Sequence, residues 1–507
     1  MVSNAYGLRQ RFGFLVSILL AIILFFLPRP AELSPQAWHV LILAITMALL
    51  WITEAIPIPV TSLIPLVFFP FLNIQPFTKV APSYANSNIF LFMGGFFIAA
   101  AMQKWELHKR VALYLIYIIG TSRRLIILGF MVASAFLSMW ISNTATVMMM
   151  YPIGIAVILQ LVPNGAKGDN NKEFQTAMML AIAYAASIGG IATLVGTPPN
   201  IVFTGSLSQL FPQAPEVSFV DWFLFGMLLL VCFLPISWFV LTRVVFKISS
   251  EKGAANRAVI ADELKRLGPM SGPEKSVGII FICTALAWIT RKNLTIGGLK
   301  IVGWGNLLGV GAFVNDATVA MASAFLLFVI PAHFRSGRFL LDWGTAVKIP
   351  WGILILFGGG IALAGGFRES GLAAWFGSQL SLFSALPIWM MILVVATLLT
   401  FLTEVTSNTA TTTLFMPILA STAVVIGVHP FLLMVPATIS ASCAFMLPVA
   451  TPPNAIIFGS GYVSIPEMAR AGIILNIIGI LLVTLITWFF LMPILGIEGS
   501  GLPAWAH

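Results

Sequence analysis

Long apolar stretches recur along the whole chain, separated by short polar segments. About 20 mainly apolar residues in a row are what an α-helix needs to cross a bilayer. Membrane-crossing helices are therefore predicted at 12–27, 38–54, 58–72, 88–103, 175–211, 218–242, 276–290, 316–332, 349–366, 431–460 and 466–493. The pattern predicts an all-α polytopic membrane protein with about 11 transmembrane helices, since only helices and closed barrels satisfy their backbone in lipid.

One polar pentapeptide, Ser-Asn-Thr-Ala-Thr, occurs twice, at 142–146 and at 407–411. A glycine pair precedes each serine and a proline follows it, with the same spacing in both copies. A Thr-Pro-Pro-Asn follows at 197–200 and again at 451–454. The glycines, serines and prolines keep one constant offset between the copies, and Thr-Pro-Pro-Asn keeps a shorter one, which an insertion close to 162–172 accounts for. This register indicates an internal duplication.

The pentapeptides interrupt two further apolar segments at mid-length, which predicts re-entrant hairpins at 125–161 and 386–427. Serine, asparagine and threonine are N-cap residues, so each motif is expected to start a half-helix. Thr-Pro-Pro-Asn predicts another helix start inside each of the broken helices 175–211 and 431–460. Paired interruptions in the two halves of a chain indicate a transporter's binding site. The alternative, small residues that only let helices pack closely, is less favoured because the motifs repeat in register.

The repeat also predicts the domain organisation. Residues 1–87 are expected to form N-terminal scaffold helices, 88–211 the core of the first repeat, 212–348 further scaffold helices with a cytoplasmic linker at 243–275, 349–460 the core of the second repeat, and 461–507 the last transmembrane helix and tail. The basic segment 104–124 predicts an amphipathic helix on the inner membrane surface, with Leu107 and Leu113 among the side chains facing lipid.

Composition agrees with a membrane protein, because 59% of the residues are hydrophobic and only 8% are charged. Soluble domains carry about 25% charged residues. The three cysteines show no metal-binding or disulfide spacing. The net charge of +9 does not indicate a nucleic-acid partner, since 20 of the 26 Lys and Arg residues fall on segments predicted to be cytoplasmic. This bias predicts an N-terminus inside and a C-terminus outside. Short tails and the lack of long insertions favour a bacterial plasma membrane.

The repeated motifs contain hydroxyls, carboxamides and freed backbone groups but no charged or titratable side chain. Carbonyl and hydroxyl oxygens suit a sodium ion, and helix N-termini suit an anion. Bound cations would then supply the positive charge that no Lys or Arg provides. The roles of Glu54 and Glu404, which lie near predicted spans, stay open between structure and coupling.

Two other classes of function compete with a transporter. An intramembrane hydrolase with Ser142 or Ser407 as nucleophile would need a base nearby, and the five histidines all fall at predicted helix ends or loops. A passive channel is the other class.

At these motifs, and at Thr-Glu-Ala-Ile-Pro (53–57) and the stretch 443–456, the chain resembles the divalent anion–sodium symporter family. The stretch 443–456 especially resembles the bacterial dicarboxylate and succinate carriers of this family, which are related to animal dicarboxylate and citrate cotransporters. The resemblance implies an inverted-topology repeat, an elevator mechanism, a homodimer surrounded by membrane lipid, sodium as the coupling ion and no organic cofactor. It implies no enzymatic activity.

The resemblance also implies a set of site residues. The substrate is expected to contact Ser142, Asn143, Thr144, Thr197, Pro198, Ser407, Asn408, Thr409, Thr451 and Pro452. One sodium ion is expected at Ser138, Ser142, Asn143 and Gly196, and a second at Thr403, Thr406, Asn408 and Ala450. The implied function is sodium-coupled import of C4-dicarboxylates such as succinate, fumarate and malate. A citrate or other tricarboxylate symporter, a sulfate symporter or a sodium-independent dicarboxylate exchanger is the alternative.

Overall fold

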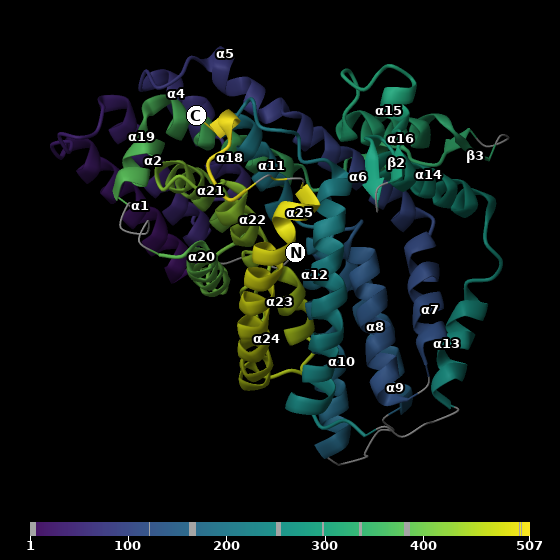
Figure 1. Cartoon of the computed structure of the whole chain (residues 1–507). Helices are drawn as coiled ribbons and strands as arrows, with labels where there is room; N and C mark the ends of the chain where they lie inside the picture. The colour runs from purple at the N-terminus through teal and green to yellow at the C-terminus, as the bar shows by residue number, and fades with distance from the viewer. Residues whose placement is uncertain are drawn as a thin grey trace.

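The computed structural model describes residues 7–120, 122–161, 169–249, 255–296, 299–333, 337–379, 386–495, 497 and 499–506. Helices make up most of this part of the chain, with four short strands between them (Figure 1). Its first helices are α1 (Leu8–Phe26), α2 (Pro35–Thr53), α3 (Ile58–Thr61), α4 (Ile64–Phe71), α5 (Phe77–Val80), a 3₁₀ turn (Ala81–Ala85), α6 (Ser87–Lys104) and α7 (Leu107–Ile119).

The next helices carry the first copy of the motifs. They are α8 (Arg123–Ser138), α9 (Asn143–Leu161), α10 (Asp169–Ile191), α11 (Pro198–Leu210) and α12 (Phe219–Phe239), which continues as a π-helical turn (Val240–Val245). The middle of the chain holds α13 (Ala255–Arg266), α14 (Gly272–Ile289), β1 (Leu294–Ile296), β2 (Leu299–Ile301), α15 (Trp304–Leu307), α16 (Asp316–Val329), β3 (Pro331–His333), β4 (Arg338–Phe339) and α17 (Trp343–Ala346). The strands form two short antiparallel pairs, β1 with β2 and β3 with β4.

The second copy of the motifs lies in the last group of helices. They are α18 (Trp351–Ser370), α19 (Leu372–Gln379), α20 (Ile388–Thr403), α21 (Asn408–Val425), α22 (Phe431–Ser440), α23 (Pro452–Phe458), α24 (Ile465–Ile486), a π-helical turn (Thr487–Leu491), α25 (Met492–Leu495) and a 3₁₀ turn (Ala504–Ala506).

Helix length and composition agree with a multi-span membrane protein. Within the described residues, nine helical stretches have at least 18 residues and are apolar enough to cross a membrane. Shorter apolar helices lie at Ile58–Phe71, Asp316–Val329, Ile388–Thr403 and Phe431–Ser440. Every segment expected to cross the membrane coincides with a helix or a pair of helices, whereas the number of crossings and the re-entrant hairpins stay predictions.

Several helix starts follow from local sequence. At the start of α12, the Ser218 N–H donates to Asp221 Oδ2 at 2.9 Å, and Asp221 N–H donates back to Ser218 Oγ at 3.4 Å. Ser271 and Glu274 form the same reciprocal pair at the start of α14. A serine followed three residues later by an acid therefore marks where these helices begin, because it satisfies backbone N–H groups that have no partner in the first turn.

The helices pack into one large hydrophobic core and a smaller one. The large core gathers side chains from α6 to α12, α14, α16 and α20 to α24, with α10 almost wholly buried against α8, α9, α12 and α23. The smaller core joins α2, α4 and α18 with parts of α19 and α21. Helix α18 contributes buried residues to both cores. The first motif copy thus lies beside the large core, where Ala145 packs, whereas Ala410 of the second copy belongs to the smaller core.

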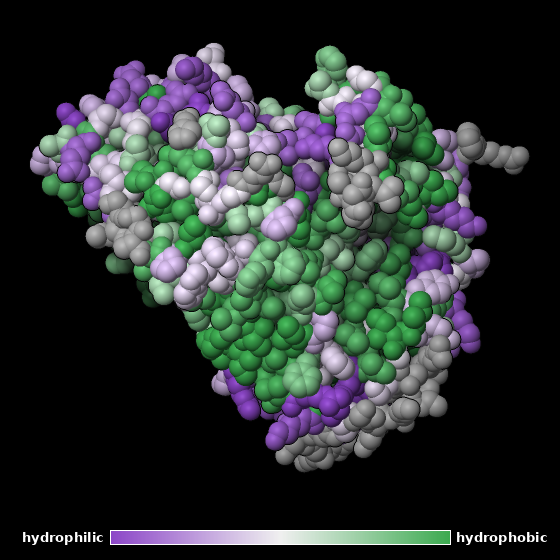
Figure 2. All heavy atoms as spheres, in the orientation of Figure 1, coloured by the Kyte–Doolittle hydropathy of each residue, from purple (hydrophilic) through white to green (hydrophobic). Residues whose placement is uncertain are grey.

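The outer faces of several long helices are apolar. On α24 the exposed side chains include Ile477, Leu481 and Leu485, and on α12 they include Leu224 and Val231. Figure 2 shows hydrophobic side chains gathered over this part of the surface, with hydrophilic residues along its lower and upper edges. Apolar patches of this extent are rare on soluble proteins, and a lipid bilayer would cover them.

Helix α7 packs against α8, α13 and α14. Arg110 is buried and donates to Glu274 Oε1 from Nε at 2.6 Å and to the Gly268 carbonyl at 2.9 Å. Leu107 and Leu113 are buried as well. The prediction that these two leucines face lipid is wrong, because α7 turns this side toward its neighbouring helices.

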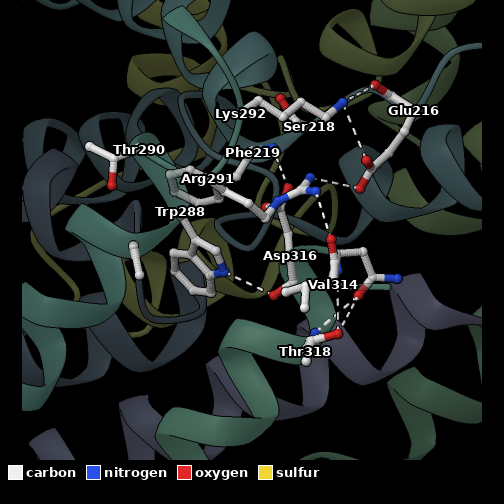
Figure 3. Close-up of polar contacts among 12 residues, drawn as sticks. Glu216, Ser218, Phe219, Trp288, Thr290, Arg291, Lys292, Val314, Asp316 and Thr318 are labelled. Carbon is white, nitrogen blue, oxygen red and sulfur yellow. Dashed lines mark hydrogen bonds and ion pairs between the residues drawn. The ribbon is translucent and has the colours of Figure 1, made fainter. Parts of the chain in front are cut away.

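An ionic cluster joins the ends of α12, α14 and α16 (Figure 3). Arg291 donates from Nε to Asp316 Oδ1 at 2.6 Å and from a terminal nitrogen to Glu216 Oε1 at 2.9 Å. Asp316 Oδ2 also accepts the Phe219 N–H, at 2.6 Å, at the start of α12. Lys292 pairs with Glu216 Oε2 at 3.2 Å on the exposed side of the cluster. The buried charges therefore hold three helices of different parts of the chain together.

Arg291→Ala is expected to destabilise the protein far more than Lys292→Ala. The Arg291 and Asp316 side chains are each only 4% exposed, so removing Arg291 leaves a buried carboxylate without its cation. Such a loss costs about 3–5 kcal/mol, whereas an exposed pair contributes about 0–1 kcal/mol. Thermal unfolding of the purified variants in detergent would compare them; equal unfolding temperatures would contradict the structural role of the cluster.

Candidate functional site

Both pentapeptides lie at the junction of two helices. Helix α8 ends at Ser138 and α9 begins at Asn143, and helix α20 ends at Thr403 and α21 begins at Asn408. Ser142 Oγ accepts the Ala145 N–H at 3.3 Å, as an N-cap does. The prediction that each motif starts a new helix is confirmed.

Thr-Pro-Pro-Asn also starts a helix in each half. Thr197 precedes α11 with φ −143° and ψ 142°, and Thr451 precedes α23 with φ −143° and ψ 149°. The prolines occupy the first helical positions, where their missing N–H has no helical partner to lose. The predicted breaks are therefore confirmed, between α10 and α11 and between α22 and α23.

The first motif brings three of the expected sodium ligands together. Ser138 Oγ donates to Asn143 Oδ1 at 2.6 Å. Gly190, the last but one residue of α10, lies directly against them: a Cβ built there would be 2.5 Å from Asn143 Oδ1 and 3.1 Å from the Gly196 carbonyl oxygen. A side chain at this position would displace the Asn143 carboxamide. Ser138, Asn143 and Gly196 thus surround one small region rich in oxygen atoms.

The second motif repeats the first contact. Thr403 Oγ1 donates to Asn408 Oδ1 at 2.6 Å and lies 2.9 Å from the Ala441 carbonyl oxygen. Thr403 and Asn408 occupy the positions of Ser138 and Asn143 in the second copy of the repeat. The Thr406 hydroxyl is instead engaged with the Thr411 hydroxyl at 2.6 Å and with the Leu402 carbonyl at 2.8 Å. In both halves, therefore, a hydroxyl at the end of one helix bonds to a carboxamide at the start of the next.

The other expected site residues differ in accessibility. Thr197, Thr451 and Thr409 are buried, and Pro452 is exposed. The half-buried members are Ser142, Asn143, Thr144, Pro198, Ser407 and Asn408. Helix α21 packs against α11, and α9 packs against α23, so each motif helix lies beside the half-helix of the other half. The gathering of all ten residues around one substrate stays a prediction.

The Glu404 carboxylate accepts hydrogen bonds from four donors. It accepts the N–H groups of Phe445 at 2.8 Å, Met446 at 2.9 Å and Leu447 at 3.0 Å, all in the break between α22 and α23. It also accepts from Asn476 Nδ2 at 2.7 Å. The carboxylate therefore anchors the segment that leads to Ala450 and Thr451.

Sequence reasoning missed several residues that hold the breaks. Asn476 supports Glu404, Tyr184 donates its hydroxyl to the Phe445 carbonyl at 2.6 Å, and Trp222 donates Nε1 to the Ile191 carbonyl at 2.9 Å. No individual role was predicted for Asn200 or Asn454, the last residue of each Thr-Pro-Pro-Asn. A buried polar residue inside an apolar helix was the available signal, but its partner lies too far away in the chain to be read from local pattern.

Uncharged side chains make the two motif contacts, Ser138 with Asn143 and Thr403 with Asn408, and the Glu404 carboxylate next to the second contact is bound to backbone N–H groups of residues 445–447. Among the described residues, no group of three His, Cys, Asp or Glu could hold a metal ion. A cation at these motifs would have to bind hydroxyl, carboxamide and backbone carbonyl oxygens, which are the ligands that broken helices offer in transporters. A cavity of about 340 Å³ lies elsewhere, between the ends of α6, α11 and α16, and none of the expected site residues lines it.

A polytopic helical chain with two paired sets of helix breaks has the architecture of a secondary transporter. The family model described as the sodium:sulfate symporter transmembrane region matches residues 9–496. The chain belongs to this family.

Two curated relatives carry the name sodium-dependent dicarboxylate transporter SdcS. The protein of Staphylococcus saprophyticus is 42% identical over 500 residues, covering 98% of this chain and 94% of the relative. The protein of Staphylococcus aureus (strain bovine RF122) is 44% identical over 494 residues, covering 96% and 93%. Both relatives are named as transporters, in agreement with the expectation of a transporter rather than an enzyme.

Two solved structures share the fold. MtrF of Neisseria gonorrhoeae, described as illuminating a class of antimetabolite efflux pumps, has a TM-score of 0.55 at 13% identity, with 96% of each chain covered. The YdaH transporter of Alcanivorax borkumensis has a TM-score of 0.57 at 11% identity, with 95% of this chain and 98% of the other covered. At these identities the likeness concerns the fold alone.

Gly196→Ala is expected to lower the unfolding temperature, because the new Cβ would overlap the Gly190 carbonyl oxygen. Overpacking of this kind costs about 1–3 kcal/mol. Gly95→Ala is the matched control, since its Cβ would meet Val195 Cγ1 at an ordinary 3.4 Å. Thermal unfolding of both variants would test the contact; a Gly196→Ala protein as stable as the control would show that the break is not packed as described.

Proposed function

We propose that this protein is a sodium-coupled secondary transporter that imports C4-dicarboxylates such as succinate, fumarate and malate across the bacterial plasma membrane. The observation that carries the proposal is the pair of equivalent contacts, Ser138 with Asn143 and Thr403 with Asn408, each at a helix break without a charged residue of its own at the contact. The names of the relatives, sodium-dependent dicarboxylate transporters at 42% and 44% identity, support the same substrate class.

Two sodium sites are proposed at these contacts. The first takes oxygen atoms from Ser138, Ser142, Asn143 and the Gly196 carbonyl. The second takes them from Thr403, Thr406, Asn408 and the Ala450 carbonyl. The first set is supported by the packing of Asn143 and Gly196 around Gly190, and the second by the hydrogen bond between Thr403 and Asn408. At each site, a sodium–oxygen contact would replace the hydrogen bond that the hydroxyl donates to the carboxamide oxygen.

The substrate is proposed to bind beside these ions. Its carboxylates would contact the N-terminal turns of α9 and α21, where Ser142, Asn143 and Thr144 and their counterparts Ser407, Asn408 and Thr409 lie, and the starts of α11 and α23 at Thr197, Pro198, Thr451 and Pro452. A helix N-terminus carries about half a positive charge. Two sodium ions would add the remaining charge needed to hold a dianion.

Coupling follows from this division of charge. Asn143 and Asn408 belong to both an ion site and the substrate site. Bound sodium would therefore raise the affinity for the substrate, and bound substrate would raise the affinity for sodium by the same factor. The proposed transport cycle is an elevator motion of the two motif-bearing cores against scaffold helices. In the proposed architecture, α8–α9 and α20–α21 form re-entrant hairpins and the protein is a homodimer in the lipid bilayer. Its N-terminus is cytoplasmic and its C-terminus is external.

A second candidate function is a sulfate or citrate symporter on the same fold. The description of the family model, which names sodium and sulfate, favours the sulfate symporter. Sulfate and citrate are anions as well and would use the same uncharged, oxygen-rich motifs. A sodium-independent dicarboxylate exchanger is the remaining alternative.

Proteoliposomes separate these functions. With an inward sodium gradient, labelled succinate is expected to accumulate, and replacing sodium by potassium or choline should remove the accumulation. Excess fumarate or malate should compete, whereas sulfate and citrate should compete weakly. Equal succinate uptake without sodium would contradict coupling, and stronger competition by sulfate or citrate would transfer the proposal to those substrates.

Asn143→Ala and Asn408→Ala are each expected to lower kcat/KM for succinate by at least about tenfold, because a hydrogen bond to a charged group contributes about 1.5–3 kcal/mol. Asn306→Ala is the control, since Asn306 lies in the exposed segment between α14 and α16 and bonds to Asn293. Uptake assays and size-exclusion elution would be measured together. Full activity of both Asn variants, with normal elution, would remove the motifs from the site.

A further inference from the structure

The last residue of each Thr-Pro-Pro-Asn is a buried asparagine that bonds back across the helix break before it. Asn200 Nδ2 donates to the Thr193 carbonyl at 2.7 Å and to the Gly190 carbonyl at 3.2 Å. In the second half, Asn454 Nδ2 donates to the Leu447 carbonyl and to the Ala444 carbonyl, both at 3.1 Å. The donors and their acceptors are all related by the offset that relates the two copies of Thr-Pro-Pro-Asn.

In each half, one of these carbonyls also holds a residue of a proposed sodium site. The Gly196 N–H donates to the Thr193 carbonyl at 3.3 Å, and the Ala450 N–H donates to the Leu447 carbonyl at 3.2 Å. Gly196 and Ala450 are the residues whose carbonyl oxygens are proposed to bind sodium. Each asparagine is therefore connected to a sodium ligand through a single shared acceptor.

The other carbonyl in the first half lies next to the same site. The Gly190 carbonyl oxygen occupies the space that a Cβ on Gly196 would need, and Gly190 itself packs against Asn143 Oδ1. Asn200 thus bonds to two carbonyls in the backbone that leads to Gly196. In the second half, Glu404 binds the N–H groups of residues 445–447 while Asn454 binds carbonyls at both ends of that segment.

An asparagine suits this task because one amide nitrogen supplies two N–H donors. A helix break leaves backbone carbonyls without helical partners, and a buried carbonyl without a hydrogen bond is destabilising. Asn200 and Asn454 are fully buried, and among the described residues the Oδ1 of each has no hydrogen-bond partner. In both residues, the amide nitrogen makes the hydrogen bonds and the amide oxygen makes none.

We infer that Asn200 and Asn454 are positioning residues for sodium binding. By tying the break before each Thr-Pro-Pro-Asn, they hold the carbonyls of Gly196 and Ala450 in the orientation that a sodium ion requires. Neither asparagine needs to touch the substrate. The inference rests on the proposed function and extends it from the ligands to the residues that set their geometry.

The test compares Asn200→Asp and Asn454→Asp with Ile201→Val and Ile457→Val. Aspartate keeps the shape but loses both donors, while the isoleucines are buried on the same two helices and bond to neither break. Asn200→Ala and Asn454→Ala repeat the loss of donors without a charge. Sodium affinity is measured without substrate, from the sodium chloride dependence of the unfolding temperature against potassium chloride, and then in proteoliposomes as the half-saturating sodium concentration for succinate uptake.

Each asparagine variant is expected to need about 10- to 100-fold more sodium, the usual loss when a residue that orients a metal ligand is changed. At saturating sodium its KM for succinate should return to the unaltered value. The isoleucine variants should keep the sodium dependence of the unaltered protein even where their unfolding temperature falls. This split separates a role in sodium binding from a role in stability alone.

Unchanged sodium dependence in the asparagine variants would overturn the inference. Loss of folded protein in both the Asp and Ala variants, with the valine controls folded, would also overturn it, since the asparagines would then carry only the fold. If the unaltered protein shows no sodium response in either assay, the proposed function fails first. That outcome is distinguishable because it requires no variant.

Discussion

Backbone groups at an interrupted helix must find partners within the protein when apolar side chains surround them. This constraint governs both halves of the chain. In the first break, Asn200 and Trp222 donate to the carbonyls that α10 leaves free, and Thr193 donates its hydroxyl to the Met139 carbonyl. In the second break, Asn454 donates to backbone carbonyls as Asn200 does in the first, and Glu404 accepts from the free N–H groups. The motifs can depart from helix only because these partners exist.

The two halves obey the constraint with different residues at equivalent positions. Glu404 occupies the position of Met139 in the second copy of the repeat, and Leu447 occupies that of Thr193. A side chain to backbone bond in the first half is therefore replaced by a carboxylate that binds three N–H groups in the second. The contacts nearest the proposed ions are shared, whereas the supports behind them differ. Two sodium sites built in this way would share ligand types but differ in affinity.

The local parts of the fold could be predicted from sequence, and the distant contacts could not. Helix starts at Asn143, Asn408, Pro198 and Pro452 follow from N-cap and proline preferences of neighbouring residues. The partners of Glu404 lie 41 to 72 residues away, and Arg110 and Glu274 are separated by 164. Such pairs depend on how helices pack, which periodicity does not specify. The lipid-facing assignment of Leu107 and Leu113 failed for this reason, since α7 is covered by other helices.

The placement of fixed charge explains why sodium and substrate would have to bind together. The buried ion pairs, Arg110 with Glu274 and Arg291 with Asp316, lie at the ends of helices, where each charge has its own partner. At the motifs, Ser138 with Asn143 and Thr403 with Asn408 are neutral. A dianion entering such a site alone would lose its hydration without gaining a counter-charge, a cost of several kcal/mol. Cations entering alone would leave the helix N-termini facing positive charge. In the proposed site, each ligand would therefore make binding of the other more favourable, and sodium and substrate fluxes would be coupled without a Lys or Arg at the contacts.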